Sequence, residues 1–286
     1  KTQLRSVIIP QSPQIAHIFE EFDDRLHKIA VYKSASGYDF DAGRVADLAN
    51  DTDAFFSMTT WHSPSIDQVL VHLSPKTSSH GFFSQYDQHF NDHNTSNLVK
   101  YARLVETGFE ASGADYAYAH KSRLWSTIPP GILDTIDASE RTVVIHPFTV
   151  SGRNHSPEFW IDVIGGLLEE HIAVRFFVIG DERNLEIKAA LDNERLIFVP
   201  PIFPVATYLI SRCDVFVGID SCFMHYADLL RRPAIGVFRS ASIALWGLGL
   251  SPIRENLSTH TLSESAARSL VIEASRRLFD RAFETG

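Results

Sequence analysis

The feature that most constrains the fold is a regular alternation of short apolar runs and amphipathic segments between Thr142 and Phe238. The apolar runs have the length and the Val, Ile and Phe content of buried strands, and they are Thr142–Ile145, Val174–Ile179, Leu196–Val199, Val215–Ile219 and Ala234–Phe238. The segments between them have helical spacing, at residues 156–169, 182–191, 205–211 and 224–230. Parallel strands need crossover connections, which are usually helices. The pattern therefore predicts an α/β domain with a parallel sheet covered on both faces.

The first half of the chain has a similar but less regular pattern. It predicts strands at residues 7–9, 29–32 and 54–58 and helices at residues 14–21, 44–48 and 97–107. Pro129, Pro130 and Gly131 break helices and suit a linker. We therefore expect a first α/β domain over residues 1–130 and a second over residues 131–265. A C-terminal helix over residues 266–286 would be able to pack back on the first domain.

Composition narrows the class of protein. The net charge of -9 argues against a nucleic-acid-binding face, which would be basic. The two cysteines, Cys213 and Cys222, form neither a disulfide framework nor a zinc pattern and suit a reducing compartment. No apolar run approaches the roughly 20 residues of a membrane span. We expect a cytoplasmic protein, either free or peripheral to the inner membrane.

The segment Val215–His225 joins a strand to a helix through Asp220 and Ser221. Ligands of open α/β sheets bind outside the carboxyl ends of the strands, and a helix N-terminus attracts phosphate. Ser221 adds a hydroxyl donor, and His225 lies one turn into the helix. The alternative interpretation is that Asp220 and Ser221 only cap the helix.

A second strand end with polar residues precedes the helix that begins near Ser156. Its loop offers neutral donors from Thr149, Ser151 and Asn154, and a forked cationic donor from Arg153, which suits a phosphate. Arg153 would alternatively be a solvated surface charge. His146 ends the strand. We expect its ring to form hydrogen bonds with backbone groups there rather than to take part in catalysis.

A third loop follows the strand Ala234–Phe238 and contains Arg239 and Ser240. This loop would be either another phosphate contact or a polar turn. All three loops follow parallel strands and so share one edge of the sheet, where an anionic nucleotide is the simplest ligand. The glycine-rich fingerprints of dinucleotide-binding and P-loop proteins are absent from the sequence.

Three stretches of this sequence resemble the ADP-heptose:lipopolysaccharide heptosyltransferases in the order and spacing of their motifs. They are IHPFTVSGRNHSPEFW, VIGDERNLE and FVPPIFPVATYLISRCDVFVGIDSCFMHYADLLRRPAIGVF. The resemblance implies two Rossmann-like domains with parallel sheets facing across a cleft, an arrangement called GT-B. It also implies inverting transfer of a sugar, from ADP-heptose or a similar donor, to a hydroxyl of a saccharide or glycolipid acceptor. No metal ion and no cofactor would be required.

Carried over by position, the resemblance assigns roles to the strand-end residues. Arg153 and His225 would stabilise the departing diphosphate, and Thr149 would contact it. Either Glu182 or Glu186 would meet the ribose or the base. The remaining substrate-binding positions would be His146, Ser151, Ile202 in the base pocket, Asp220, Ser221, the backbone of Cys222, Arg239 and Ser240.

The sequence also departs from the family pattern. Cys222 replaces a motif glycine, and its Cβ would narrow the approach of backbone to phosphate. Arg239 and Ser240 stand where the family has Gly-Pro, and Arg153 where it has lysine. The donor is therefore expected either to differ from ADP-heptose or to bind less tightly. The family's general base lies on a first strand and loop that would precede Lys1, so the first domain would lack that strand here and no base is named.

Two other functions remain open at this stage. A nucleotide-sugar epimerase would use the same scaffold without an acceptor, and a glycosyltransferase-like module would bind nucleotide without turnover. The histidines of the polar stretch after residue 71 are His72, His80, His89 and His93. Together with the segment Trp61–Ser63 they are interpreted as acceptor contacts or ordinary surface loops rather than a metal site.

Overall fold

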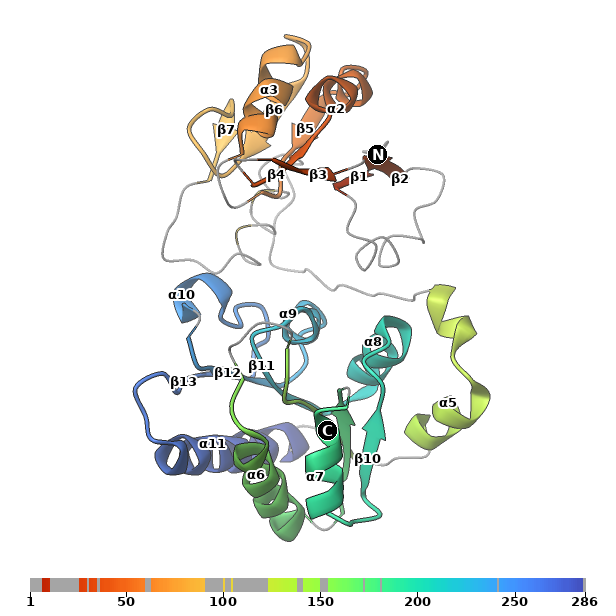
Figure 1. Ribbon diagram of the computed structural model, residues 1–286, viewed down its shortest axis with the longest axis vertical. Coiled ribbons are helices and arrows are strands. Elements are labelled where there is room, and N and C mark those ends of the chain that lie inside the picture. The colour runs from red at the N-terminus through yellow and green to blue at the C-terminus, as the bar shows by residue number, and fades with distance from the viewer. Residues whose placement is uncertain are drawn as a thin grey trace. The chain divides into compact units, whose positions relative to one another are not determined.

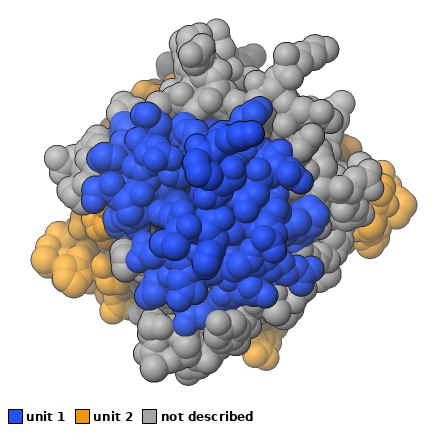
Figure 2. All heavy atoms as spheres, turned by 90° about the horizontal axis from the view of Figure 1, so that it is seen from above, with its two compact units in different colours: residues 1–116 blue, residues 117–286 orange. Residues whose placement is uncertain are grey.

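The computed structural model describes residues 7–10, 26–29, 31–34, 37–59, 63–90, 100, 104, 123–137, 141–149, 154–171, 173–180, 182–240 and 242–284. The chain forms two compact units, Lys1–Tyr116 and Ala117–Gly286, which Figure 2 colours separately. Residues 117–130, expected in the first domain, therefore lie in the second. They do so because η3 (Arg123–Thr127) packs on α8, where the indole Nε1 of Trp125 donates to Thr207 Oγ1 at 3.1 Å.

The second unit is built on a six-stranded parallel sheet (Figure 1). Its strands are β8 (Thr142–His146), β9 (Arg175–Ile179), β10 (Leu196–Val199), β11 (Val215–Ile219), β12 (Ala234–Phe238) and β13 (Arg254–Ser258). The spatial order is β10-β9-β8-β11-β12-β13. Counted along this unit, the order is 3-2-1-4-5-6, as in Rossmann folds. The predicted parallel sheet is confirmed, with β13 as an additional strand.

Helices cover both faces of this sheet. They are α5 (Pro130–Asp137), α6 (Pro157–Glu170), α7 (Asn184–Ala190), α8 (Phe203–Arg212), α9 (Cys222–Leu229), α10 (Ile243–Trp246) and α11 (Glu264–Glu284). Alternate strand residues face opposite sides, so Val143 packs with α6 and α11 whereas Val144 packs with α8 and α9. Every residue of β8, β11 and β12 is buried. These three strands therefore form the buried centre of the second unit.

Local sequence explains where the helices begin. Ser156 is the N-cap of α6, accepting a hydrogen bond from Phe159 N, and Pro157 occupies the first helical turn. Ser221 caps α9 in the same way, accepting from Met224 N. The last helix, α11, packs on α6 and on the sheet strands β11 to β13. Residues 266–286, expected as a separate element, thus belong to the second unit.

The first unit is also of α/β type. Its described elements are β1 (Val7–Pro10), β2 (Leu26–Ile29), β3 (Val31–Ser34), β4 (Gly37–Phe40), α2 (Ala42–Ala49), β5 (Ala54–Phe56), α3 (Pro64–His72), β6 (Ser78–Gly81) and β7 (Gln88–His89). β1 pairs with β2 and β5-β6-β7 form a second sheet, both parallel, while β3 and β4 are antiparallel. The α2–α3 pair encloses a small core that includes Val45, Ala46 and Val69.

One predicted strand of this unit differs in the structure, and two predicted helices lie wholly or mostly outside the described residues. The single strand expected at residues 29–32 is two strands in different sheets, since Ile29 ends β2 and Val31 begins β3. The helix expected at residues 14–21 lies outside the described residues. Of the helix expected at residues 97–107, only Lys100 and Leu104 are described, and both are helical and buried.

Candidate functional site

The strand order of the second unit reverses between β8 and β11. From β8 the chain moves to β9 and β10 on one side, and from β11 to β12 and β13 on the other. The loops that leave β8 and β11 therefore run in opposite directions, and in open α/β sheets such divergence leaves a crevice outside the carboxyl ends of the two strands. This topological switch point is the position at which open α/β sheets bind ligands, and two of the three predicted loops meet there.

His146 and Ser221 join across the switch point. The ring Nδ1 of His146, at the end of β8, lies 3.0 Å from Ser221 Oγ, at the start of α9. The His146 ring is buried and stands edge-on to Phe223 with centroids 4.9 Å apart. Ser221 is thus both a helix cap and a partner of His146. The capping interpretation of Ser221 is correct, and the serine also ties the two strand ends together.

Asp220, between β11 and α9, and His225, on α9, form a neighbouring pair. Asp220 directly follows β11, and its Oδ1 is 3.5 Å from His225 Nε2. Their side chains are 9% and 21% exposed, so Asp220 is nearly buried and His225 keeps some contact with solvent. The His225 ring is tilted against Trp246 with centroids 5.9 Å apart. Cys222, a cysteine that would more usually be a small buried hydrophobic residue, is instead exposed at the first position of α9.

The loop between β8 and α6 is closed by a side chain. Asn154 Oδ1 accepts from Thr149 N at 2.8 Å, and Asn154 Nδ2 donates to Thr149 O at 2.9 Å. Arg183 Nη1 donates to the same Thr149 oxygen at 2.8 Å. Ser151 and Arg153, predicted for this loop, lie outside the described residues. Sequence reasoning counted Asn154 only as a neutral donor and did not single out Arg183.

Arg239 and Ser240 are both exposed after the end of β12. Arg239 Nη1 donates to the backbone oxygen of Asn154, which brings the third predicted loop, after β12, against the second, after β8. The Arg239 oxygen accepts from His260 Nδ1 at 2.8 Å. These loops are far apart in sequence, so their contact follows from the order of the strands.

His155 lies under the same loops and was not predicted. Its Nε2 is 2.8 Å from Thr259 Oγ1, and its ring stacks on Phe159 with centroids 3.9 Å apart. Burial, with a smaller contribution from the positive charge of Arg239, lowers the pKa of His155 to about 4. His155 is therefore neutral at physiological pH and supports the loop as an uncharged group.

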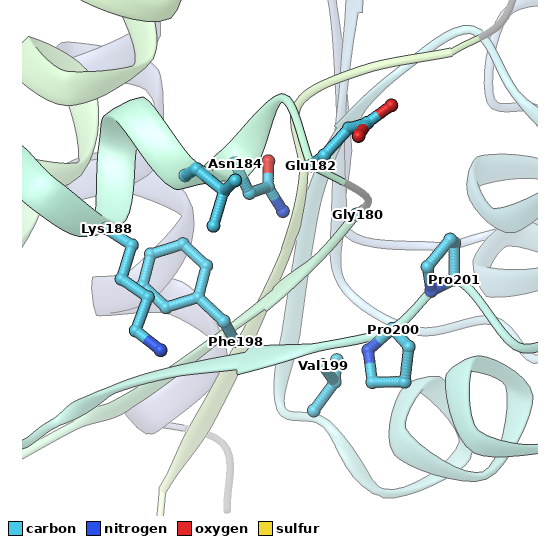
Figure 3. Close-up of a pocket in the computed structure, with 9 residues that line it drawn as sticks. Gly180, Glu182, Asn184, Lys188, Phe198, Val199, Pro200 and Pro201 are labelled. Carbon is cyan, nitrogen blue, oxygen red and sulfur yellow. The ribbon is translucent and has the colours of Figure 1, made fainter.

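A pocket of about 380 Å³ lies at the carboxyl ends of β9 and β10 (Figure 3). Its walls are mostly apolar and its lining residues are Gly180, Glu182, Asn184, Leu185, Lys188, Phe198, Val199, Pro200 and Pro201. Lys188 Nζ lies 6.0 Å from the centre of the Phe198 ring. Of the two predicted glutamates, Glu182 lines the pocket and Glu186 does not. Ile202 follows the lining prolines and is 54% exposed.

The three histidines that the structure describes in the polar stretch after residue 71 lie on three different elements of the first unit. His72 is exposed at the end of α3, and His89 is exposed in β7. His80 is buried, stacks on Phe56 with centroids 4.6 Å apart, and has a pKa lowered by burial. His93, Trp61 and His62 lie outside the described residues. No group of three or more metal-ligating side chains occurs among the residues that the structure describes.

The second unit and its neighbouring sequence match a known family. Residues 93–277 match the model of glycosyltransferase family 9 (heptosyltransferase), which is more than half of the chain. The chain belongs to glycosyltransferase family 9. No curated protein sequence matches it. Among the helices in the described ranges, none is long and apolar enough to cross a bilayer.

Solved structures of family 9 glycosyltransferases share the fold. A family 9 glycosyltransferase from Veillonella parvula has a TM-score of 0.65 at 13% identity, covering 96% of this chain and 88% of that one. The ADP-heptose lipopolysaccharide heptosyltransferase II of Escherichia coli has a TM-score of 0.58 at 13% identity, covering 96% and 90%. The E. coli heptosyltransferase WaaC with ADP has a TM-score of 0.55 at 16% identity, covering 79% and 74%. The predicted GT-B fold class is thereby confirmed, while the facing of its two sheets stays a prediction.

Proposed function

We propose that this family 9 enzyme transfers a sugar from a nucleoside-diphosphate sugar to an acceptor hydroxyl. The observation that carries the proposal is a cluster of four polar side chains at the switch point. His146 contacts Ser221 there, and Asp220 contacts His225 at the N-terminus of α9. This arrangement puts hydroxyl, imidazole and helix N–H donors together at the edge where α/β sheets bind phosphorylated ligands.

The donor would lie along the carboxyl edge of the sheet. Its diphosphate would meet the N-terminus of α9, with the His225 imidazole and the Arg239 guanidinium as nearby donors and Arg153 and Ser151 as further contacts. Its nucleoside would extend toward the pocket at β9 and β10, where Glu182 can accept from ribose hydroxyls. The apolar walls of that pocket and the exposed Ile202 suit a flat base.

The reaction would be a single displacement at the anomeric carbon. The bond from that carbon to the diphosphate oxygen breaks, and its electron pair leaves with the diphosphate. Donors preorganised around the leaving group stabilise this charge without a metal ion or cofactor. The acceptor oxygen attacks from the opposite face, which inverts the configuration, and its proton passes to a carboxylate base that is not assigned here.

ADP-heptose or a close relative is the donor that we favour. Family membership supports this choice, and one structural relative was solved with ADP. The exposed Cys222 at the start of α9 adds a side chain next to the proposed diphosphate site and should weaken the fit. We propose a saccharide or glycolipid acceptor, and a cytoplasmic location that is either free or peripheral to the inner membrane.

Calorimetric titration with ADP, UDP and GDP, with and without EDTA, tests the proposal. At least one nucleotide should bind, equally well with the chelator, and the His225→Ala variant should weaken it roughly tenfold through loss of a donor to a charged group. The His72→Ala variant removes an exposed histidine of the first unit and serves as the control. Absence of binding by all three nucleotides would overturn the proposal.

Product analysis then tests the reaction. NMR of the glycoside should show an anomeric configuration opposite to that of the donor. Interconversion of a nucleotide sugar in the absence of any acceptor would instead indicate an epimerase. Nucleotide binding without turnover, across a panel of saccharide and glycolipid acceptors, would favour a binding module.

A further inference from the structure

We infer that Asn184 reads the base of the donor, by a pair of hydrogen bonds between its side-chain amide and the 6-amino group and an adjacent ring nitrogen of adenine. The inference rests on the proposed function, because it concerns the pocket at the carboxyl ends of β9 and β10, where the nucleoside is proposed to bind. Asn184 thereby determines which nucleotide the pocket accepts, whereas the apolar walls hold any flat ring.

The amide of Asn184 is buried in the wall of this pocket without a partner. Asn184 is 4% exposed, and neither its Oδ1 nor its Nδ2 forms a hydrogen bond with any residue that the structure describes. Buried polar side-chain atoms are nearly always paired, because an unpaired donor or acceptor destabilises the folded chain. A ligand that supplies both partners therefore accounts for the retention of an amide at this position.

Gly180 makes room for the amide. A Cβ at residue 180 would collide with Asn184 Nδ2, and would lie 2.7 Å from Asn184 Cγ and 2.8 Å from Asn184 Oδ1. Both residues line the pocket, and Figure 3 shows the Asn184 amide between the start of α7 and Gly180. Both amide atoms are covered in the folded chain, so the side chain turns toward the base on binding. Side-chain rotamer changes of this kind are common when a partner binds.

Asn184 does not stabilise the start of α7 as its position would suggest. Asparagine is favoured at the N-cap, where its side chain accepts from a free backbone N–H. Here Arg183 is the N-cap residue and makes no side-chain capping bond, and Asn184 follows as the first residue of the helix. Its Oδ1 accepts from no backbone N–H of the described chain either. A role in the helix therefore does not explain the amide.

The polar groups of the pocket match adenine better than the other bases. A carboxamide carries a donor beside an acceptor, and adenine presents the complementary pair. Among the described lining residues, Asn184 is the one buried polar side chain, since Glu182 and Lys188 are exposed. Adenine has a single exocyclic polar group, which this amide pairs. Guanine has an oxo and an amino group and uracil has two oxo groups, so either base would leave one of them unpaired inside the pocket.

The test compares ADP with purine riboside 5′-diphosphate, which lacks only the 6-amino group, by calorimetric titration of the intact protein. The wild type should bind ADP roughly tenfold more tightly, because loss of the amino group leaves Asn184 Oδ1 unpaired. Asn184→Leu replaces the amide by an apolar group of the same branching. It should weaken ADP roughly tenfold and bind the two nucleotides within about twofold of each other.

The matched control is Asn193→Leu. Asn193 Oδ1 accepts from Arg195 N at 3.0 Å in the turn that precedes β10, at the opposite edge of the sheet from the pocket. This variant should keep the wild-type preference for ADP. Thermal denaturation of each variant shows which are folded, and the smaller Asn184→Ala repeats the comparison if Asn184→Leu does not fold.

The outcomes separate the two proposals. If the wild type binds ADP and purine riboside 5′-diphosphate equally well, the inference is overturned without any variant, and the proposed function stands. The same holds if the preference for ADP persists in the Asn184 variants. Tighter binding of UDP or GDP than of ADP by the wild type would overturn the assignment to adenine. If the wild type binds no nucleoside diphosphate, the proposed function itself fails.

Discussion

Replacement of Asp228 should destabilise the second unit strongly, because this carboxylate organises the loop after α10. Asp228 lies on α9, one turn beyond His225, and its side chain is fully buried. Its Oδ2 accepts from Gly249 N at 2.8 Å, and its Oδ1 accepts from Leu250 N at 3.0 Å and Ser251 N at 2.8 Å. The carboxylate thus fixes the far end of the helix that presents Ser221 and His225 to the crevice.

The magnitude follows from the hydrogen bonds. Asp228→Ala leaves three backbone N–H groups without their charged acceptor, and hydrogen bonds to charged groups contribute about 1.5–3 kcal/mol each. Desolvation of the carboxylate offsets part of this sum, so we expect a loss of about 3–5 kcal/mol in the free energy of unfolding. Asp228→Asn keeps one acceptor oxygen and leaves one N–H unsatisfied, which predicts about 1–3 kcal/mol.

Urea denaturation followed by tryptophan fluorescence measures the effect. Trp125, Trp160 and Trp246 all lie in the second unit, so the signal reports mainly on it. Asp192→Ala removes an exposed carboxylate from the same unit and should change stability by no more than about 0.5 kcal/mol. The reasoning is refuted if Asp228→Ala costs less than about 1 kcal/mol, or if the Asn variant is less stable than the Ala variant.

Two further predictions concern pH and strand packing. Burial lowers the pKa of His155 from its ordinary value of 6.5 to about 4 in the folded chain, so between these pH values the unfolded chain binds a proton that the folded chain does not. Stability should therefore fall as pH drops from 6.5 toward 4, by at most roughly 1.4 kcal/mol per pH unit, and His155→Phe should flatten this dependence in denaturation curves. Gly218→Ala should cost about 1–3 kcal/mol and also weaken nucleotide binding, because the new Cβ would lie 2.8 Å from the Phe216 ring and 3.2 Å from His146 O. Gly131→Ala, whose Cβ would meet nothing within 4 Å, is the control, and equal stability of the two variants would contradict the packing argument.

Most strands of the second unit can be predicted from the local pattern of apolar residues. A buried parallel strand must be apolar on both faces, so the runs at β8, β9, β11 and β12 are visible in the sequence and agree with the structure within one residue at either end. β13 was not predicted because its sequence, RENLS, is mostly polar, with Leu257 its one buried residue. It is a strand because it pairs in parallel with β12 at the edge of the sheet, which local sequence does not encode.

In the first unit as well, local sequence predicts some elements correctly and fails for others. Residues 29–32 are apolar enough to read as one strand, yet Ile29 pairs with β1 and Val31 with β4. Strand propensity depends on the partner more than on the residue itself, so a continuous run gives no sign of a change of sheet. α2 was predicted because its apolar residues recur on one helical face, and Val45 and Ala46 are buried there.

The sequence by itself established that three polar loops follow buried parallel strands, and therefore that Thr149, Ser221 and Arg239 stand near one edge of a sheet. It did not establish which loops touch, because that depends on strand order, and alternation of strands and helices is compatible with several orders. The order 3-2-1-4-5-6 makes β8 and β11 neighbours. This order brings His146 to Ser221 across 75 residues of sequence, and Asn154 to Arg239 across 85. Such contacts are set by the packing of the whole sheet between its helices, which is a property of the folded chain and not of any segment.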